Sequence, residues 1–412
     1  MAIRGIDVKI VFLLGLALIS CVANGADHLA SRRHLLHDNV CVFDVTKLGV
    51  KAGPGHCVEN TASLMKAWVQ ACESDVPAKL LIPQGTYEIG AVNFQGPCKR
   101  PIIFELLGTV QAARDVNGYP ERTWFHFEEI DSLQLTGSGR GVFDGQGPYF
   151  WPHSKCRHNN RCKITLPSSI KFRRITNSVI HGFTSLNSPA FHMHVISSNN
   201  FTAHSLTIIA PDESPNTDGM HISTSCNVKV TNSRIGTGDD CLSVGQGNSD
   251  ITISHIDCGP GHGISVGSLG KYAHETNVKG VLVTDCTLTN TTNGARIKTW
   301  LASPTLKASS ITFQNIIMNM VKNPIIIDQE YGAQRPEPSN VALTDVHFKN
   351  IRGTSISEVP VSLVCSKTFP CCVDMTDINL VYKGDENEIE KAECVSAKVN
   401  FFGKQNPPPC RC

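Results

Sequence analysis

Two aspartates and one histidine recur at a fixed interval in the second half of the chain. Asp218 and Asp240 are 22 residues apart, and His262 follows Asp240 after another 22 residues. In a solenoid with about that many residues per coil, such positions lie one above another, separated by one strand spacing of roughly 4.8 Å. Asp239 directly precedes Asp240 and joins the same group. The spacing therefore predicts a compact cluster of three carboxyl groups and one imidazole.

Such a cluster divides acid and base roles among its members. Like charges in a partly desolvated cleft raise one another's pKa, so one carboxylic acid lies beside two carboxylates. Glycoside hydrolysis requires this arrangement, because one group protonates the leaving oxygen while the others take a proton from water. His262 stands between two glycines, which leave its ring open to a ligand. We expect His262 to tune the acid or to hold a substrate hydroxyl.

Two cations, Arg296 and Lys298, follow the cluster. They are two residues apart, so their side chains share one side of a strand. Paired cations beside carboxylates fit a substrate that itself carries carboxylates, which Arg binds bidentately. Taken singly, these motifs are also compatible with a solvated turn, a charged strand face or a calcium site built from carboxylate oxygens. Their common register favours catalysis, and we expect no metal and no other cofactor.

A weak repeat positions these residues. An apolar-alternating run followed by Asn, Asp or Ser recurs from Leu133 onward, with later starts at Val179, Phe201, Val228, Ile251, Val281, Ile311 and Val341. Short β-rich segments at this period predict an all-β fold, a right-handed parallel β-helix. A propeller would need about 40 residues per blade, and a sandwich would not repeat one motif so often. The longer coils after Ile251 predict added loops on the binding face.

Both ends of the predicted solenoid carry a covering element. Residues 62–73 place Leu64, Trp68 and Cys72 at helical spacing, which predicts a short amphipathic helix over the N-terminal end. Residues 362–412 are rich in cysteine and predict a disulfide-stapled tail over the other end. A zinc site is the alternative there, and an oxidising compartment favours disulfides.

Residues 1–25 resemble a signal peptide, with Arg4 and Lys9 before a short apolar run and small residues after it. We expect a flexible lead-in over residues 26–40 and a single catalytic domain over residues 41–412. We expect the mature protein to be a secreted monomer with no membrane partner once the signal is cleaved.

All of the 17 cysteines except Cys21 follow this segment, which leaves an even number that suits disulfides. The net charge of +1 gives no basis for nucleic-acid binding.

Four blocks, in their order and spacing, resemble the signature of the polygalacturonases. These are pectin-degrading glycoside hydrolases with a right-handed parallel β-helix. The blocks read Asn216-Thr-Asp-Gly, Gly238-Asp-Asp, Gly261-His-Gly and Arg296-Ile-Lys. The resemblance covers nearly the whole chain after the signal.

The resemblance implies hydrolysis of α-1,4-linked galacturonan with inversion. It makes Asp239 the general acid, has Asp218 and Asp240 activate the water, and gives His262 a supporting role. It also implies substrate binding by four further residues, namely Asn216, Arg296, Lys298 and Tyr331. The residues themselves do not indicate which aspartate is the acid.

Segments near the N-terminus, such as Gly90-Ala-Val-Asn-Phe-Gln-Gly-Pro-Cys, look most like the exo-acting, pollen-type members. That likeness implies release of galacturonate from the non-reducing end of polygalacturonan in the cell wall. The alternatives are an endo-acting polygalacturonase, a calcium-dependent pectate lyase with the same fold, and a non-catalytic pectin-binding wall protein. Tyr331 is followed by Gly332, where the family usually has a cysteine.

Overall fold

The computed structural model describes residues 40–158, 165–332, 336–384 and 390–410. The expected signal peptide and all but the last residue of the expected lead-in lie outside this part of the chain. Residues 37–412 cluster as one compact unit.

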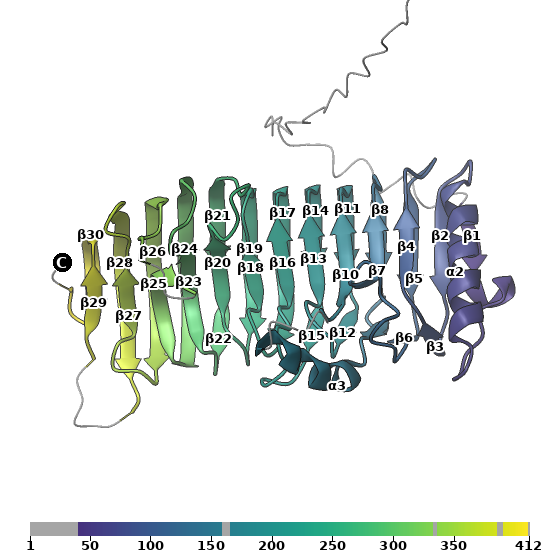
Figure 1. Cartoon of the computed structure of the whole chain (residues 1–412), viewed down its shortest axis with the longest axis horizontal. Coiled ribbons are helices and arrows are strands. Elements are labelled where there is room, and N and C mark those ends of the chain that lie inside the picture. Colours follow the sequence, from purple (N-terminus) through teal and green to yellow (C-terminus); the bar gives the residue numbers. More distant parts are fainter. Residues whose placement is uncertain (1–39, 159–164, 333–335, 385–389, 411–412) are drawn as a thin grey trace, which may run out of the picture. The chain divides into compact units, whose positions relative to one another are not determined.

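Two sheets of parallel strands dominate the described residues (Figure 1). The smaller one, here called sheet B, contains one strand from each successive coil. Its strands in spatial order are β4 (Val92–Gln95), β7 (Thr123–Glu128), β10 (Ser168–Arg173), β13 (Met193–Ile196), β16 (Met220–Ser223), β18 (Leu242–Val244), β20 (Ile264–Leu269), β23 (Asn293–Trp300), β25 (Asn323–Tyr331), β27 (Val361–Val364) and β29 (Ala392–Val395).

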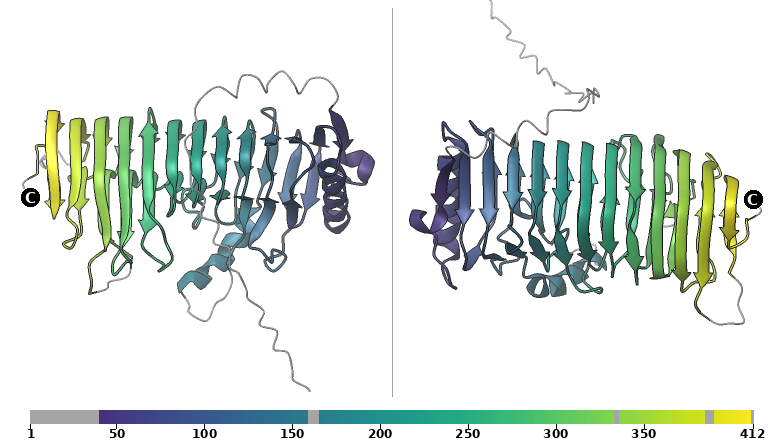
Figure 2. Two further views of the ribbon diagram at one scale, coloured as in Figure 1. Left: turned by 90° about the horizontal axis from the view of Figure 1, so that it is seen from above. Right: turned by 180° about the vertical axis from the view of Figure 1, so that it is seen from behind.

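The larger sheet, sheet A, combines two stacks of strands (Figure 2). The first stack is β1 (Cys41–Asp44), β2 (Ala78–Ile82), β5 (Ile102–Leu106), β8 (Leu133–Thr136), β11 (Thr176–His181), β14 (Asn199–His204), β17 (Cys226–Gly236), β19 (Ser249–Cys258), β21 (Val278–Thr284), β24 (Leu306–Val321), β26 (Val341–Ser355), β28 (Cys371–Tyr382) and β30 (Ala397–Asn406). The second is β3 (Thr86–Ile89), β6 (Thr109–Ala112), β9 (Val142–Asp144), β12 (Thr184–Leu186), β15 (Thr207–Ile209) and β22 (Thr287–Thr289). Long strands join the stacks, since β17 pairs with both β14 and β15. The predicted right-handed parallel β-helix is confirmed.

Alternation along each strand separates an apolar interior from a polar outer face. In β10, Ile170 and Phe172 are buried, whereas Lys171 and Arg173 are half-buried on the opposite face. The Phe172 ring stacks on Phe127 of the paired strand at 5.4 Å, and Phe201 of sheet A packs against it at 5.1 Å, centroid to centroid. This interior supports sheet B from behind and fixes the direction of its outer side chains.

One long helix, α2 (Cys57–Cys72), packs against the first strands and begins five residues before the predicted start. Its buried residues include Leu64 and Trp68, and the Trp68 indole donates to the Gln95 carbonyl at 3.1 Å. The sequence carries no clear signal for α3 (Gly147–Phe150), η1 (Val45–Leu48) or η2 (Trp151–His158), because such short helices show little periodicity. No described helix is long and apolar enough to cross a membrane.

The cysteine-rich tail carries disulfides, Cys365–Cys371 and Cys394–Cys410, rather than a zinc site. Besides covering the C-terminal end, the tail continues the coils with four strands, β27 to β30. Residues 411–412 lie outside the described part. Not every cysteine is paired, because Cys286 is a buried thiol within the core.

The structure corrects the length of one predicted coil. Spacing of the sequence motifs aligns Val341 with Ile311, the start of the preceding motif. In the structure Val341 pairs with Leu306, and Ile311 pairs with Val346. The coil is therefore longer than the motif spacing suggests. The additional residues belong to the connection between β25 and β26. The distance between motif starts does not separate such a connection from the strands.

Candidate active site

Sheet B brings the predicted cluster into register. Met220 pairs with Leu242, which pairs with Ile264 on the next coil. Asp218, Asp240 and His262 each precede one of these residues by two positions. The repeated interval between them is therefore one coil, as the sequence predicts.

Backbone contacts between coils hold the turns that carry these residues. The amide of Gly219 donates to the Asp240 carbonyl at 2.9 Å, and the amide of His262 donates to the Asp239 carbonyl at 2.8 Å. Gly263 has a φ of 85°, and a Cβ at this position would collide with the carbonyl oxygen of Asn293. The glycine after His262 is therefore required by close packing of the coils as well as by its φ.

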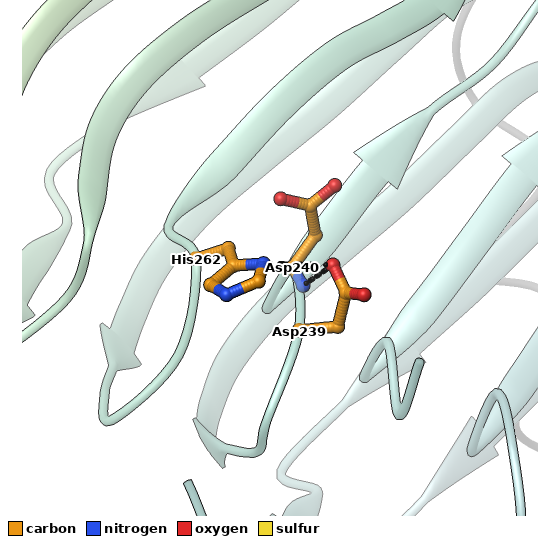
Figure 3. A group of neighbouring side chains, drawn as sticks. All are labelled: Asp239, Asp240 and His262. Carbon is orange, nitrogen blue, oxygen red and sulfur yellow. Dashed lines mark hydrogen bonds and ion pairs between the residues drawn. The ribbon is translucent and has the colours of Figure 1, made fainter. Parts of the chain in front are cut away.

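Asp239 and His262 form a hydrogen-bonded pair at the surface of the cluster (Figure 3). His262 Nδ1 lies 3.0 Å from Asp239 Oδ1, and the Asp240 amide donates to the same oxygen at 2.8 Å. Burial of Asp239 acts to raise its pKa, but the hydrogen bond and charge of His262 lower it overall. The same hydrogen bond raises the pKa of His262. The pair thus favours a protonated imidazole beside a carboxylate.

Asp240 is buried and meets donors at both oxygens. Lys298 Nζ lies 2.7 Å from Oδ2, the Ser265 hydroxyl donates to Oδ1 at 2.8 Å, and an Arg296 guanidinium nitrogen lies 3.5 Å from Oδ1. Ligand atoms of Asp239, Asp240 and His262 lie within 4.8 Å of one another, close enough to share an ion. A metal there would have to compete with the Lys298 ammonium for Asp240, so these donors fit an ion pair better than a calcium site.

Asp218 is 6% exposed and belongs to a chain of three polar side chains. The Ser243 hydroxyl donates to Asp218 Oδ2 at 2.8 Å, and Ser243 Oγ lies 2.7 Å from His221 Nδ1. Burial, followed by the charges of Asp239 and Asp240, raises the pKa of Asp218 well above its ordinary value. In the protein by itself, the proton of the cluster therefore favours Asp218 over Asp239.

Three of the four predicted binding residues, Arg296, Lys298 and Tyr331, lie on β23 and β25 at one side of the cluster. The Tyr331 ring centroid is 6.0 Å from the Arg296 guanidinium carbon and 5.4 Å from Lys298 Nζ. Arg296 Nε is buried and has no hydrogen-bond partner among the described residues. Asn216 is half-buried in the turn before Asp218 with a φ of 56°, and within the described part of the chain we find no hydrogen bond from its side chain to the cluster.

Sequence reasoning missed three polar residues of the site: His221, Ser243 and Ser265. They follow one another at the same interval as the predicted cluster, and the strand pairings place them side by side. The interval was therefore a signal for them too. They were overlooked because neutral serine and histidine side chains are common on strands and do not by themselves indicate a catalytic site.

Solved structures share this fold at low sequence identity. An endo-xylogalacturonan hydrolase from Aspergillus tubingensis matches with a TM-score of 0.77 at 23% identity, covering 89% of this chain and 99% of that chain. A polygalacturonase from Erwinia carotovora matches with a TM-score of 0.71 at 22% identity, covering 88% of this chain and 96% of that chain.

Curated relatives are more similar in sequence. A protein named exopolygalacturonase from Arabidopsis thaliana is 44% identical over 418 residues, which cover 99% of this chain and 97% of the relative. One of the same name from Platanus acerifolia is 42% identical over 372 residues, which cover 89% and 97%. The family model described as glycosyl hydrolases family 28 matches residues 72–400. The chain carrying this cluster therefore belongs to family 28 of the glycosyl hydrolases.

Proposed function

We propose that this protein is a polygalacturonase that hydrolyses α-1,4-galacturonosyl linkages of polygalacturonan with inversion. One observation carries the proposal: three aspartates on adjacent coils share a site with two cations, and both cations contact Asp240. Such a site combines the acid and base of glycoside hydrolysis with groups that recognise an acidic sugar.

The proposed reaction needs protonation states opposite to those of the protein by itself, so a proton has to move onto Asp239 and off Asp218 when the substrate binds. Asp239 delivers a proton to the glycosidic oxygen, and His262 at 3.0 Å is the group from which it regains one. A water attacks the anomeric carbon from the opposite face, and its proton passes to Asp218 or Asp240. The bond to the leaving oxygen breaks as the bond to water forms, so the configuration inverts. Asp218 serves as base only when ionised, which its burial opposes and the Ser243 hydrogen bond favours.

Recognition of the acidic sugar is assigned to Arg296. Its buried Nε has no hydrogen-bond partner among the described residues, whereas the Lys298 ammonium is engaged by Asp240. A substrate carboxylate supplies the missing acceptor, and the neighbouring Tyr331 ring offers a face against which the sugar can pack. Because the family consists of hydrolases and Asp240 is engaged by ammonium, a hydrolase is favoured over a calcium-dependent lyase.

The exo mode, the location and the oligomeric state are part of this proposal. Relatives from Arabidopsis thaliana and Platanus acerifolia are both named exopolygalacturonase, which supports release of galacturonate from the non-reducing end. The signal-like segment over residues 1–25 supports secretion to the cell wall, where the protein acts as a monomer.

The product profile on polygalacturonic acid, measured by chromatography with ultraviolet detection and a calcium chelator present, tests the proposal. Galacturonate alone from the earliest time points is the expected result. A ladder of saturated oligomers would keep the hydrolytic mechanism but replace the exo mode with an endo mode. Unsaturated products that appear only after calcium is restored would overturn hydrolysis.

A further inference from the structure

A second pair of cations occupies the outer face of sheet B, on the other side of the acidic cluster. Lys171 and Arg173 lie two residues apart on β10, as Arg296 and Lys298 do on β23. Strand pairing connects Lys171 to Arg296 through one continuous row, in which each residue pairs with the next. The row is Lys171, His194, His221, Ser243, Ser265 and Arg296.

The two ends of this row share a pattern of charge compensation. At β23, Asp240 engages Lys298, and Arg296 Nε has no partner among the described residues. At β10, Glu128 lies 3.1 Å from Arg173 and forms an ion pair with it. The ammonium of Lys171 has no ion pair or hydrogen bond with any described residue, although Lys171 is only half-buried and faces outward. Each end of the row therefore keeps one cationic side chain with an unsatisfied donor.

The side chain next to Lys171 on the adjacent strand supplies a further donor. His126 pairs with Lys171, is 4% exposed, and has no hydrogen-bond partner at either ring nitrogen within the described part of the chain. Burial, followed by the charge of Lys171, lowers the pKa of His126 to about 4, so its ring is neutral and retains one N–H. Burial and the charge of Arg173 lower the pKa of Lys171, and the charges of Glu121 and Glu128 only partly oppose them. A bound anion would favour the charged form of Lys171 and accept the N–H of His126.

We propose that Lys171, with His126 beside it, binds the carboxylate of a second galacturonate unit, on the opposite side of the cleavage point from Arg296. The proposal rests on the proposed function, because it takes polygalacturonan as the occupant of the cleft. β10 is two strand steps from β16, so Lys171 lies roughly 10 Å along the sheet from the coil of Asp218. The distance from Lys171 to Arg296 spans five steps, roughly 24 Å. Release of one unit at a time leaves a single galacturonate at Arg296, so the units that bind toward Lys171 belong to the remaining polymer, which lies along sheet B.

Binding measured without turnover tests this site. In an Asp239→Asn background, calorimetry with a saturated galacturonate hexamer gives the reference affinity. Adding Lys171→Met weakens binding by roughly 10-fold or more, the value of one hydrogen bond to a charged group. Lys171→Arg retains the affinity within a few-fold, because it keeps the charge. Lys279→Met is the matched control, since Lys279 is exposed on β21 of sheet A and its loss leaves binding unchanged.

The fully methyl-esterified hexamer shows whether a carboxylate is recognised. Lys171→Met has little effect on its already weaker binding if Lys171 contacts a carboxylate. An equal loss for both ligands, or unchanged binding of the acidic hexamer, overturns the proposal. Lys171→Gln repeats the comparison should the Met variant fold poorly, as judged by its thermal midpoint. A wild-type protein that neither binds the hexamer nor releases product contradicts the proposed function itself, whereas normal turnover with unaltered Lys171→Met binding contradicts only this site.

Discussion

Ser243 donates a hydrogen bond of 2.8 Å to the buried carboxyl group of Asp218 from the adjacent strand. Ser265 repeats the contact one coil later, donating to Asp240 at the same distance. In both cases the serine lies at the same sequence separation from its aspartate, so the coil itself supplies a hydroxyl to each carboxyl group. These two serines stabilise negative charge on carboxyl groups that are largely buried.

Replacing Ser243 by Ala is expected to raise the pKa of Asp218 further, because the hydrogen bond that favours its carboxylate is lost. Since Asp218 acts as base only when ionised, the acid limb of kcat/KM should move to higher pH. The measurement is the pH profile of galacturonate release.

A matched control for this change exists in the core. Ser185 Oγ lies 2.8 Å from His192 Nδ1, both residues are fully buried, and neither bonds a carboxyl group through its side chain among the described residues. Ser185→Ala should destabilise the fold comparably and leave the acid limb in place. Equal shifts in both variants would mean that Ser243 acts only through stability.

Asp239→Asn should lower turnover by about 10²- to 10⁴-fold, the usual contribution of a positioned general acid. Folding and binding of the galacturonate hexamer should persist, because the amide has nearly the same shape. Initial rates and calorimetry measure the two effects separately. Asp257→Asn on the exposed face of β19 serves as the control. Near-normal turnover in Asp239→Asn would rule out Asp239 as the acid.

Replacing Lys298 and replacing Arg296 on β23 should have different effects on stability and on substrate binding. Lys298→Met leaves buried Asp240 without its ion-pair partner at 2.7 Å, which is expected to cost about 3–5 kcal/mol of unfolding free energy together with activity. Arg296→Gln should mainly raise KM for polygalacturonate, because the Arg296 contact to Asp240 is longer, at 3.5 Å. Urea unfolding and steady-state kinetics distinguish these outcomes, and identical losses of stability would contradict the division of roles.

The His262–Asp239 pair should make stability depend on pH near neutrality. The pKa of His262 is raised in the folded protein by its hydrogen bond to Asp239. The pair therefore adds stability that is fully present below about pH 6.5 and is lost as the pH rises through the raised pKa. Urea midpoints measured across this window should fall less in His262→Gln than in the wild type. His255 lies on the outer side of β19, so His255→Gln should keep the wild-type dependence of the urea midpoint on pH. The same dependence in all three proteins would exclude the His262–Asp239 pair as its cause.

The recurring apolar-alternating motif predicted the fold, and the constant interval between Asp218, Asp240 and His262 predicted their positions, because parallel pairing turns chain spacing into spatial register. It did not reveal that His262 bonds Asp239 rather than Asp240, since that choice depends on side-chain directions within a turn. Nor did the interval indicate which carboxyl group has the highest pKa. The pKa of Asp218 reflects how deeply the coil buries it, and a single sequence contains no direct measure of burial.

Stacking of one strand per coil also restricts how the distance between binding groups can change. Deleting one residue of β23 before Arg296 would turn Arg296 to the opposite face of the sheet and remove the cation from the site, whereas a deletion in a connection between strands leaves its facing unchanged. Deleting or inserting a whole coil would preserve the facing and move Arg296 by one step of roughly 4.8 Å. The spacing of carboxylate contacts along the polymer is therefore quantised, and related chains can change it only by gaining or losing complete coils.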